Sequence, residues 1–255
     1  MPFVTRGQSQ LYYEVHGDGP PLVLAHGVGG NHASWYNQIA SLSDRFRVIV
    51  FDARGFGNSL DAEGLGRSGF VDDLAAILDA LAVERAVLVG QSMGGGTCLS
   101  FTCRHPQRVR ALMLADTLMG FALPDDLRAL MAERERQTAD LSQAERVVGP
   151  TFRRTQPALT RLYLELATLN RVTVRTLTGV QLLHSPQELA ATGVPTLFLV
   201  GAEDALFPPA IVRAVQERTP GSRFVEVRAS GHSAYFEQPA VFDQILTDWL
   251  AGIAE

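Results

Sequence analysis

The chain has 255 residues, of which 46% are hydrophobic, and it carries a formal net charge of −5 at pH 7. A chain of this size forms one large domain or one domain with an insertion, and its acidic balance argues against a nucleic-acid or anionic-membrane partner. It holds no apolar run long enough for a transmembrane helix and no signal-peptide core near its start, so we expect a cytoplasmic protein.

Short apolar runs alternate with helical patterns along most of the chain. The runs that predict strands cover residues 11–15, 21–27, 47–55, 86–90, 109–116, 194–204 and 222–230. The patterns that predict helices cover residues 70–83, 95–106, 208–219 and 238–253. This alternation predicts an α/β fold with a mostly parallel central sheet and helices on both faces. The first two strands are joined by the tight turn "HGDGPP", and we expect them to pair as an antiparallel edge.

The alternation stops between residues 117 and 190. This stretch has no strand pattern and predicts helices over residues 123–137, 142–148, 156–169 and 170–183. Ser142 and Glu145 have the spacing of a capping box at the start of one of them. We therefore expect a helical cap at 117–190, inserted into a core domain of residues 1–116 and 191–255. It would cover the carboxyl ends of the strands, where open α/β sheets bind their ligands.

Lysine is absent, because all 22 basic residues are arginine. This excludes Schiff-base chemistry and a phosphate-binding Gly-Lys-Ser/Thr loop. Cys98 and Cys103 lie five residues apart in a predicted helix, which is too far for a disulfide. We expect neither a cofactor nor a metal ion.

The stretch "VLVGQSMGGG" at residues 87–96 places Ser92 between a predicted strand and a predicted helix. Gly-x-Ser-x-Gly in this context is typical of a nucleophile elbow. The sharp turn forces strained backbone angles on Ser92, and only small neighbours such as Gly90 and Gly94 avoid a clash.

A serine nucleophile needs a base, and the base needs a carboxylate. Of the six histidines, His232 stands out, because it follows a predicted strand in a glycine-containing loop before the last helix. Asp204 lies just after another strand and is the favoured carboxylate, with Asp116 and Glu203 as rivals. The chain order Ser92, Asp204, His232 is the one expected of this strand–helix arrangement.

The oxyanion formed on acyl transfer needs preorganised donors. The backbone N–H of Met93, directly after the serine, is one candidate. The N–H of Val28, in the glycine-rich loop after the strand at 21–27, is the other. We expect His26, at the start of that loop, to shape the turn.

Five motifs occur in order at ordinary spacing: "HGVGG", "DARGFGNS", "GQSMGG", "GAEDALFP" and "SGHSAYFEQP". Together they resemble the α/β-hydrolase superfamily over almost the whole chain. The resemblance implies a Ser92–Asp204–His232 triad, a helical cap and an active site between cap and sheet. A serine nucleophile also argues against dehalogenases and epoxide hydrolases of this fold, which carry Asp there.

The resemblance is strongest to small carboxylesterases, enol-lactonases and C–C bond hydrolases of ring-cleavage products. Ser233 and Gln91 occupy places at which the C–C bond hydrolases usually carry other residues. A C–C bond hydrolase is therefore the less favoured alternative. We therefore expect a serine hydrolase that cleaves a small ester or lactone through an acyl-enzyme on Ser92. The alternative from another class is a ligand-binding sensor on the same fold.

A mostly apolar pocket should hold the small-molecule substrate. The residues expected to line it are Gly27, Trp35, Gln91, Met119, Phe121, Tyr163 and Phe207. Arg153, Arg154 and Arg161 in the insertion are expected on a solvated helix face, with binding of a substrate carboxylate as the alternative. A homodimer is compatible with the sequence.

Overall fold

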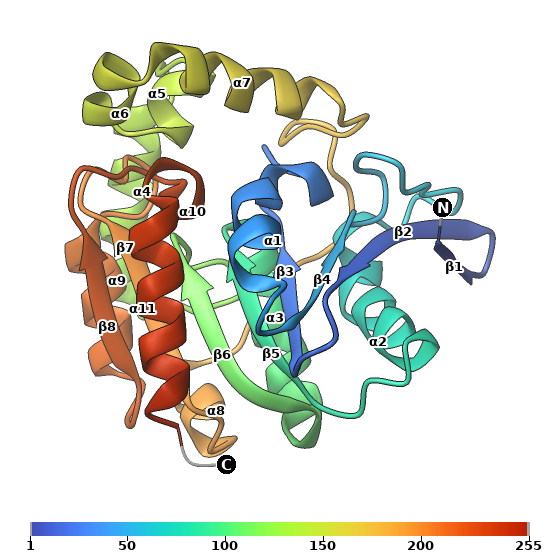
Figure 1. The fold of residues 1–255 in the computed structure, drawn as a ribbon. Helices are drawn as coiled ribbons and strands as arrows, with labels where there is room; N and C mark the ends of the chain where they lie inside the picture. Colours follow the sequence, from blue (N-terminus) through green and yellow to red (C-terminus); the bar gives the residue numbers. More distant parts are fainter. Residues whose placement is uncertain (1, 254–255) are drawn as a thin grey trace.

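The computed structural model describes residues 2–253 and contains, within them, one eight-stranded sheet (Figure 1). The strands are β1 (Phe3–Arg6), β2 (Ser9–His16), β3 (Pro21–Ala25), β4 (Arg47–Phe51), β5 (Ala86–Gln91), β6 (Val109–Ala115), β7 (Thr196–Gly201) and β8 (Arg223–Val227). Their order is β1-β2-β4-β3-β5-β6-β7-β8. β1 pairs antiparallel with β2, as β2 does with β4, and every later pair in this order, from β4–β3 to β7–β8, is parallel. This confirms the predicted mostly parallel sheet.

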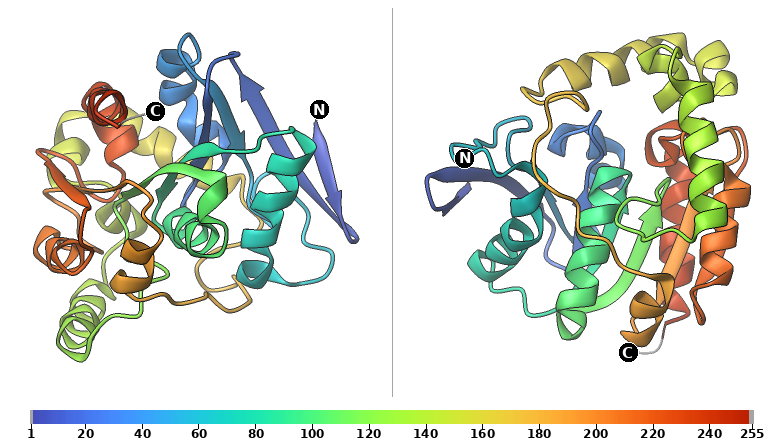
Figure 2. Two further views of the ribbon diagram at one scale, coloured as in Figure 1. Left: turned by 90° about the horizontal axis from the view of Figure 1, so that it is seen from below. Right: turned by 180° about the vertical axis from the view of Figure 1, so that it is seen from behind.

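Helices cover both faces of the sheet, as the views in Figure 2 show. They are α1 (Tyr36–Leu42), α2 (Phe70–Ala80), α3 (Met93–Arg104), α9 (Pro209–Glu217), α10 (Ala234–Glu237) and α11 (Pro239–Ala251). Successive strand residues point to opposite faces. In β3, Val23 packs into the hydrophobic core that includes α2, α3 and α9, whereas Leu22 and Leu24 pack into the core on the α1 and α11 side. This is why the strands read as continuous apolar runs.

The pairing expected between the first two predicted strands is wrong. β4 lies between β2 and β3, pairing antiparallel with β2 and parallel with β3. The turn that joins β2 to β3 packs against the loop before β4. A side chain at Gly17, where φ is 79°, or at Gly19 would overlap carbonyl oxygens of Ser43 and Arg45. The turn therefore crosses this loop instead of closing a hairpin, and β1 is an additional edge strand that the sequence analysis did not predict.

Between β6 and β7 the chain forms five helices among the described residues. They are α4 (Asp125–Thr138), α5 (Gln143–Val147), α6 (Pro150–Thr155), α7 (Pro157–Thr168) and α8 (Pro186–Ala191). Helices α5 to α7 lie beyond the carboxyl ends of the strands (Figure 1), while α4 packs beside α9 and α8 packs against α3. The predicted helices at 123–137, 142–148 and 156–169 are confirmed, and Ser142 and Glu145 form the predicted capping box.

The helix predicted over residues 170–183 is wrong, because this segment has no regular structure. Six of its fourteen residues are β-branched, which weakens helix formation. Gly179 has φ of 81°, a left-handed conformation that a helix cannot accommodate. The segment instead runs back along the core toward α8, and the carbonyl of Thr178 accepts a hydrogen bond from the amide of Arg67.

Cys98 and Cys103 are both free, as predicted. Within residues 2–253, no helix combines the length and the hydrophobicity needed to cross a membrane.

Candidate active site

Ser92 occupies the turn between β5 and α3. Its φ of 49° and ψ of −116° lie in a strained region of the backbone, as the sequence predicted. A Cβ at Gly94 would overlap the carbonyl of Ala25, and one at Gly90 would lie 2.6 Å from the Gly94 carbonyl oxygen. The turn therefore requires the two flanking glycines. The Ser92 amide donates to Ala115 O at 3.1 Å, which ties the turn to β6.

His232 is paired with Asp204. Its Nδ1 lies 3.0 Å from Asp204 Oδ2, and both side chains are buried. The other carboxylate oxygen, Oδ1, accepts the amides of Leu206 at 2.7 Å and Phe207 at 3.0 Å, so the carboxylate is held on both sides. This pairing places the proton of a neutral imidazole on Nδ1 and leaves Nε2 unprotonated. Within residues 2–253, Ser92 Oγ makes no hydrogen bond to the ring, but both residues border the same cavity.

The charges around His232 favour its imidazolium form. Burial lowers the pKa of His232, but the Asp204 carboxylate, through its charge and its hydrogen bond, together with the Asp116 and Glu237 carboxylates outweighs burial, so the pKa is raised overall. Asp116, the rival carboxylate, does not pair with the ring. It accepts the amides of Gly201 at 2.8 Å and Ala234 at 3.0 Å. Burial, reinforced by the nearby Asp204 charge, raises the pKa of Asp116.

Glu203, the other rival, binds the insertion. Its carboxylate accepts the Thr151 amide at 2.9 Å and the Thr151 hydroxyl at 2.5 Å. It therefore fixes the start of α6 against the loop that carries Asp204.

Glu237 is a buried carboxylate that the sequence analysis missed. It accepts the amides of Gly231 at 2.9 Å and Ser233 at 3.1 Å, the two residues that flank His232. It also accepts the amide of Gly149 in the insertion at 2.8 Å, and burial raises its pKa to about 7. The available signal was an acidic residue at the end of the otherwise apolar run "AYFE", directly after the histidine loop.

Gln91 joins the serine turn to the histidine loop. Its Nε2 donates to the carbonyl of His232 at 2.7 Å, and its side chain borders the cavity. Gly27 does not border the cavity. It lies directly against this turn, because a Cβ there would overlap Gln91 Oε1 and come within 3.0 Å of Ser92 Cβ.

A cavity of about 790 Å³ opens beside Ser92 and His232. Six further predicted residues border it, namely Val28, Gln91, Met93, Met119, Tyr163 and Phe207. The insertion contributes other lining residues from α4, α5, α7 and the segment 172–175. Arg153, Arg154 and Arg161 do not border it, and Arg153 and Arg161 pair with Glu145 and Glu165.

Trp35 and Phe121 are corrections to the predicted pocket. Trp35 is fully buried and its ring lies 4.2 Å from that of Tyr235, between η1 (His32–Trp35) and α10. Phe121 stacks on Phe198 of β7 at 5.8 Å. Large apolar rings near strand ends gain more by packing into the core than by facing an open cavity, and the sequence does not distinguish the two positions.

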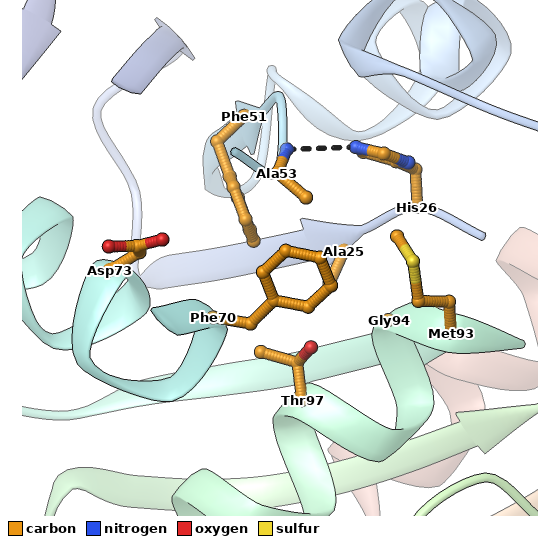
Figure 3. A pocket seen from close by; sticks show the side chains of 9 residues that line it. All are labelled: Ala25, His26, Phe51, Ala53, Phe70, Asp73, Met93, Gly94 and Thr97. Atoms are coloured by element: carbon orange, nitrogen blue, oxygen red, sulfur yellow. Dashed lines mark hydrogen bonds between the residues drawn. The ribbon is translucent and has the colours of Figure 1, made fainter. Parts of the chain in front are cut away.

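Val28 and Met93, the expected oxyanion donors, border the cavity together with Ser92. Met93 begins α3, so its N–H has no acceptor within the helix. His26 fixes the loop that carries Val28. Its Nδ1 donates to Gly27 O at 2.7 Å, and its Nε2 accepts the Ala53 amide at 3.0 Å (Figure 3). Burial lowers the pKa of His26, which keeps this bridging ring neutral.

Figure 3 also shows Phe51, Phe70 and Thr97 around the small void of about 10 Å³ behind Met93. The void is too small for a substrate, so it belongs to the packing that supports the turn. Across residues 2–253, no group of three or more His, Cys, Asp or Glu is placed to hold a metal ion.

Comparison with known proteins confirms the resemblance. The chain matches the alpha/beta hydrolase fold family over residues 20–239 and belongs to that family. It is 29% identical to the pimeloyl-acyl-carrier-protein methyl ester esterase of Aeromonas hydrophila, covering 91% of this chain and 96% of that protein.

Two solved structures are similar over nearly their full length. A thermophilic esterase from Thermogutta terrifontis has a TM-score of 0.82 at 28% identity, covering 97% of this chain and 95% of that chain. Est816, described as an N-acyl homoserine lactone degrading enzyme, has a TM-score of 0.80 at 27% identity, covering 97% of this chain and 99% of that chain.

Proposed function

We propose that this protein is a serine hydrolase that cleaves a small-molecule carboxylic ester or lactone through an acyl-enzyme on Ser92. The observation that carries the proposal is geometric. A serine in a strained strand–helix turn borders the same cavity as a histidine whose Nδ1 lies 3.0 Å from a buried aspartate. This arrangement matches the roles of nucleophile, base and orienting carboxylate.

In the first step, Ser92 Oγ bonds to the substrate carbonyl carbon and its proton passes to His232 Nε2. Asp204 holds the ring through Nδ1 and stabilises the imidazolium that forms. The Val28 and Met93 amides donate to the oxyanion. Collapse of the tetrahedral intermediate breaks the bond to the leaving alcohol, which takes the proton from His232.

In the second step, water attacks the acyl carbon and gives a proton to His232. The second tetrahedral intermediate then releases the acid, and Ser92 recovers its proton from the imidazolium. For a lactone the alcohol and the acid remain one molecule, so the same two steps give a hydroxy acid.

The relatives support an ester or lactone as substrate, because their names describe a methyl ester esterase, a thermophilic esterase and a lactone-degrading enzyme. The cavity is of a size that holds a small molecule, and its lining mixes apolar side chains with a similar number of polar and charged ones.

The test is hydrolysis of p-nitrophenyl acetate and butyrate, a small lactone and a vinylogous diketone by the parent and by Ser92→Ala. We expect the parent to hydrolyse the esters or the lactone and Ser92→Ala to lose at least roughly 1,000-fold in kcat. Thermal melting of both proteins checks that the variant is folded. Undiminished turnover by Ser92→Ala would contradict the mechanism. Turnover of the diketone alone would favour C–C bond hydrolysis, and a ligand-induced melting shift without turnover would favour a sensor.

A further inference from the structure

One guanidinium beside the proposed active site lacks a counter-charge. Arg67, on the short helix η2 (Gly66–Gly69) before α2, borders the same cavity as Ser92 and His232. Its Nε is buried and has no hydrogen-bond partner among residues 2–253. Burial lowers the pKa of Arg67, and no nearby carboxylate offsets this effect. Arginine nevertheless stays protonated in proteins, so a partly desolvated positive charge faces the cavity.

Arg153 Nε is also buried without a hydrogen-bond partner, but the Arg153 guanidinium pairs with Glu145 at 3.8 Å and does not border the cavity. Arg54 shows how a buried guanidinium is usually paired. Arg54 is fully buried, and its guanidinium binds Asp73 through Nε at 2.7 Å and Nη2 at 2.6 Å. It also contacts Asp61 and Glu63, each at 3.2 Å. This pattern, in which a buried charge is paired, is the usual one in proteins.

The backbone that carries Arg67 is fixed by the segment that returns from the insertion. The Arg67 amide donates to Thr178 O at 3.0 Å, and Val180 N donates to Ser68 Oγ at 3.0 Å. A Cβ at Gly66 would overlap the Thr178 carbonyl, so the two loops are in close contact. The guanidinium is therefore presented from a supported position, which reduces the entropy lost when it binds a ligand.

The other charges that line the cavity have the same net sign. Arg146 and Arg175 also border it, whereas Glu135 is the one carboxylate among its lining residues. Three cations therefore face one anion, on a protein whose overall charge is −5.

We infer that Arg67 forms a subsite for a carboxylate on the substrate, so that the ester or lactone cleaved at Ser92 is itself an anion. The inference rests on the proposed function and narrows its substrate class to a monoester of a dicarboxylic acid or a lactone with a free carboxylate. Because Nε is buried, the planar guanidinium can bind a carboxylate end-on through its two Nη groups, which together donate two hydrogen bonds.

The test compares two esters of equal chain length, mono-p-nitrophenyl glutarate and p-nitrophenyl pentanoate. They differ in a terminal carboxylate in place of a methyl group. We expect the parent to have a higher kcat/KM for the glutarate ester. Arg67→Gln should lose about 10- to 100-fold on the glutarate ester and stay within about two-fold on the pentanoate ester. Arg67→Lys keeps the positive charge but loses the planar pair of donors. Its kcat/KM for the glutarate ester should lie between those of the parent and Arg67→Gln.

Arg154→Gln is the matched control, because Arg154 is an exposed arginine of the insertion that does not border the cavity. It should leave both esters unchanged. Equal turnover of the two esters by the parent, or an equal loss on both in Arg67→Gln, would overturn the inference and leave the proposed function standing. Loss of the anion preference in Arg146→Gln or Arg175→Gln but not in Arg67→Gln would also overturn the assignment to Arg67.

A binding measurement separates this inference from the proposed function. Glutarate is titrated by calorimetry into Ser92→Ala protein and into the Ser92→Ala, Arg67→Gln double variant. We expect at least about 10-fold weaker binding by the double variant. If Ser92 proves unnecessary for ester turnover but this difference remains, the mechanism fails while the carboxylate subsite stands. Equal affinity of the two proteins would overturn the subsite.

Discussion

The two sides of the cavity are built differently. On the sheet side, Asp204, His232 and Glu237 are each no more than 5% exposed, and backbone amides or side chains bind every carboxylate. On the opposite side, the segment at 169–184 has no helix, and Val174, which borders the cavity, is 61% exposed. The sheet side therefore fixes the positions of the proposed catalytic side chains, while the other side mainly contributes surface that a substrate would contact. We expect substitutions on the sheet side to change kcat and substitutions on the other side to change KM.

The insertion itself follows the same division. Near α5 and α7 it is bound to the histidine loop, because Ser233 Oγ donates to Val147 O at 2.7 Å and to the Tyr163 hydroxyl at 2.9 Å. The return segment, residues 169–184, also hydrogen-bonds the core, for example through the Asn170 side chain, which donates to Gly30 O at 3.0 Å, but most of its side chains are exposed. Local opening is easier where buried contacts are few, so any widening of the cavity should begin at the return segment.

The largest effect should come from Asp204→Asn. An asparagine cannot accept the Nδ1–H in the same way and favours the wrong tautomer, so kcat for a small ester should fall by roughly 1,000- to 10,000-fold with KM little changed. The matched control is Asp116→Asn, which removes a neighbouring buried carboxylate that binds backbone amides instead of the ring. Steady-state kinetics of both variants tests this prediction. A larger loss of kcat in Asp116→Asn than in Asp204→Asn would contradict the role given to Asp204.

A smaller loss should follow Glu237→Gln. The amide can accept some of the three backbone N–H groups that Glu237 binds, but its NH2 group would face one of them. The loop that carries His232 should loosen, and kcat at pH 8 should drop by about 10-fold, the effect of one lost charge-assisted hydrogen bond. KM for a small ester should change far less. A rise in KM with unchanged kcat would show that Glu237 does not position His232.

The same pair of proteins gives a pH dependence. Burial raises the pKa of Glu237 to about 7 from its ordinary value of 4.5. Between these values the folded state keeps a proton that the unfolded state has lost, so this group's contribution to stability falls as the pH rises. From pH 4.5 to pH 8, the parent should lose up to about 3 kcal/mol of unfolding free energy relative to Glu237→Gln. Denaturant unfolding across this range tests the trend, and a constant difference would contradict it.

The smallest effect should come from Val174→Ser on the return segment. Val174 borders the cavity but is 61% exposed, so its loss should leave the unfolding free energy within about 0.5 kcal/mol of the parent. KM for an apolar ester should rise a few-fold, because about 1 kcal/mol of apolar contact is lost. A fall in kcat as large as that of Glu237→Gln would contradict the expectation that substitutions on this side of the cavity change mainly KM.

Local patterns predicted most of the fold. The strands from residue 47 onward appear where continuous apolar runs stand, because both faces of a parallel sheet are covered. The helix predicted at 170–183 is wrong, because its β-branched residues and Gly179 disfavour a helix. The pairing of β2 also failed, since a short connection suggests a hairpin and only tertiary packing places β4 in between.

The sequence by itself determined the strand–turn–helix at Ser92, because a glycine on each side is the local requirement of that strained turn. It also singled out His232 and Asp204 by their places after strands. Only the tertiary structure showed that Asp204, and not Asp116, reaches the ring, that Glu237 holds the loop around it, and that Trp35 and Phe121 belong to the core. These outcomes depend on side chains distant in the sequence, and a local pattern carries no information about which of two carboxylates or two faces such a side chain meets.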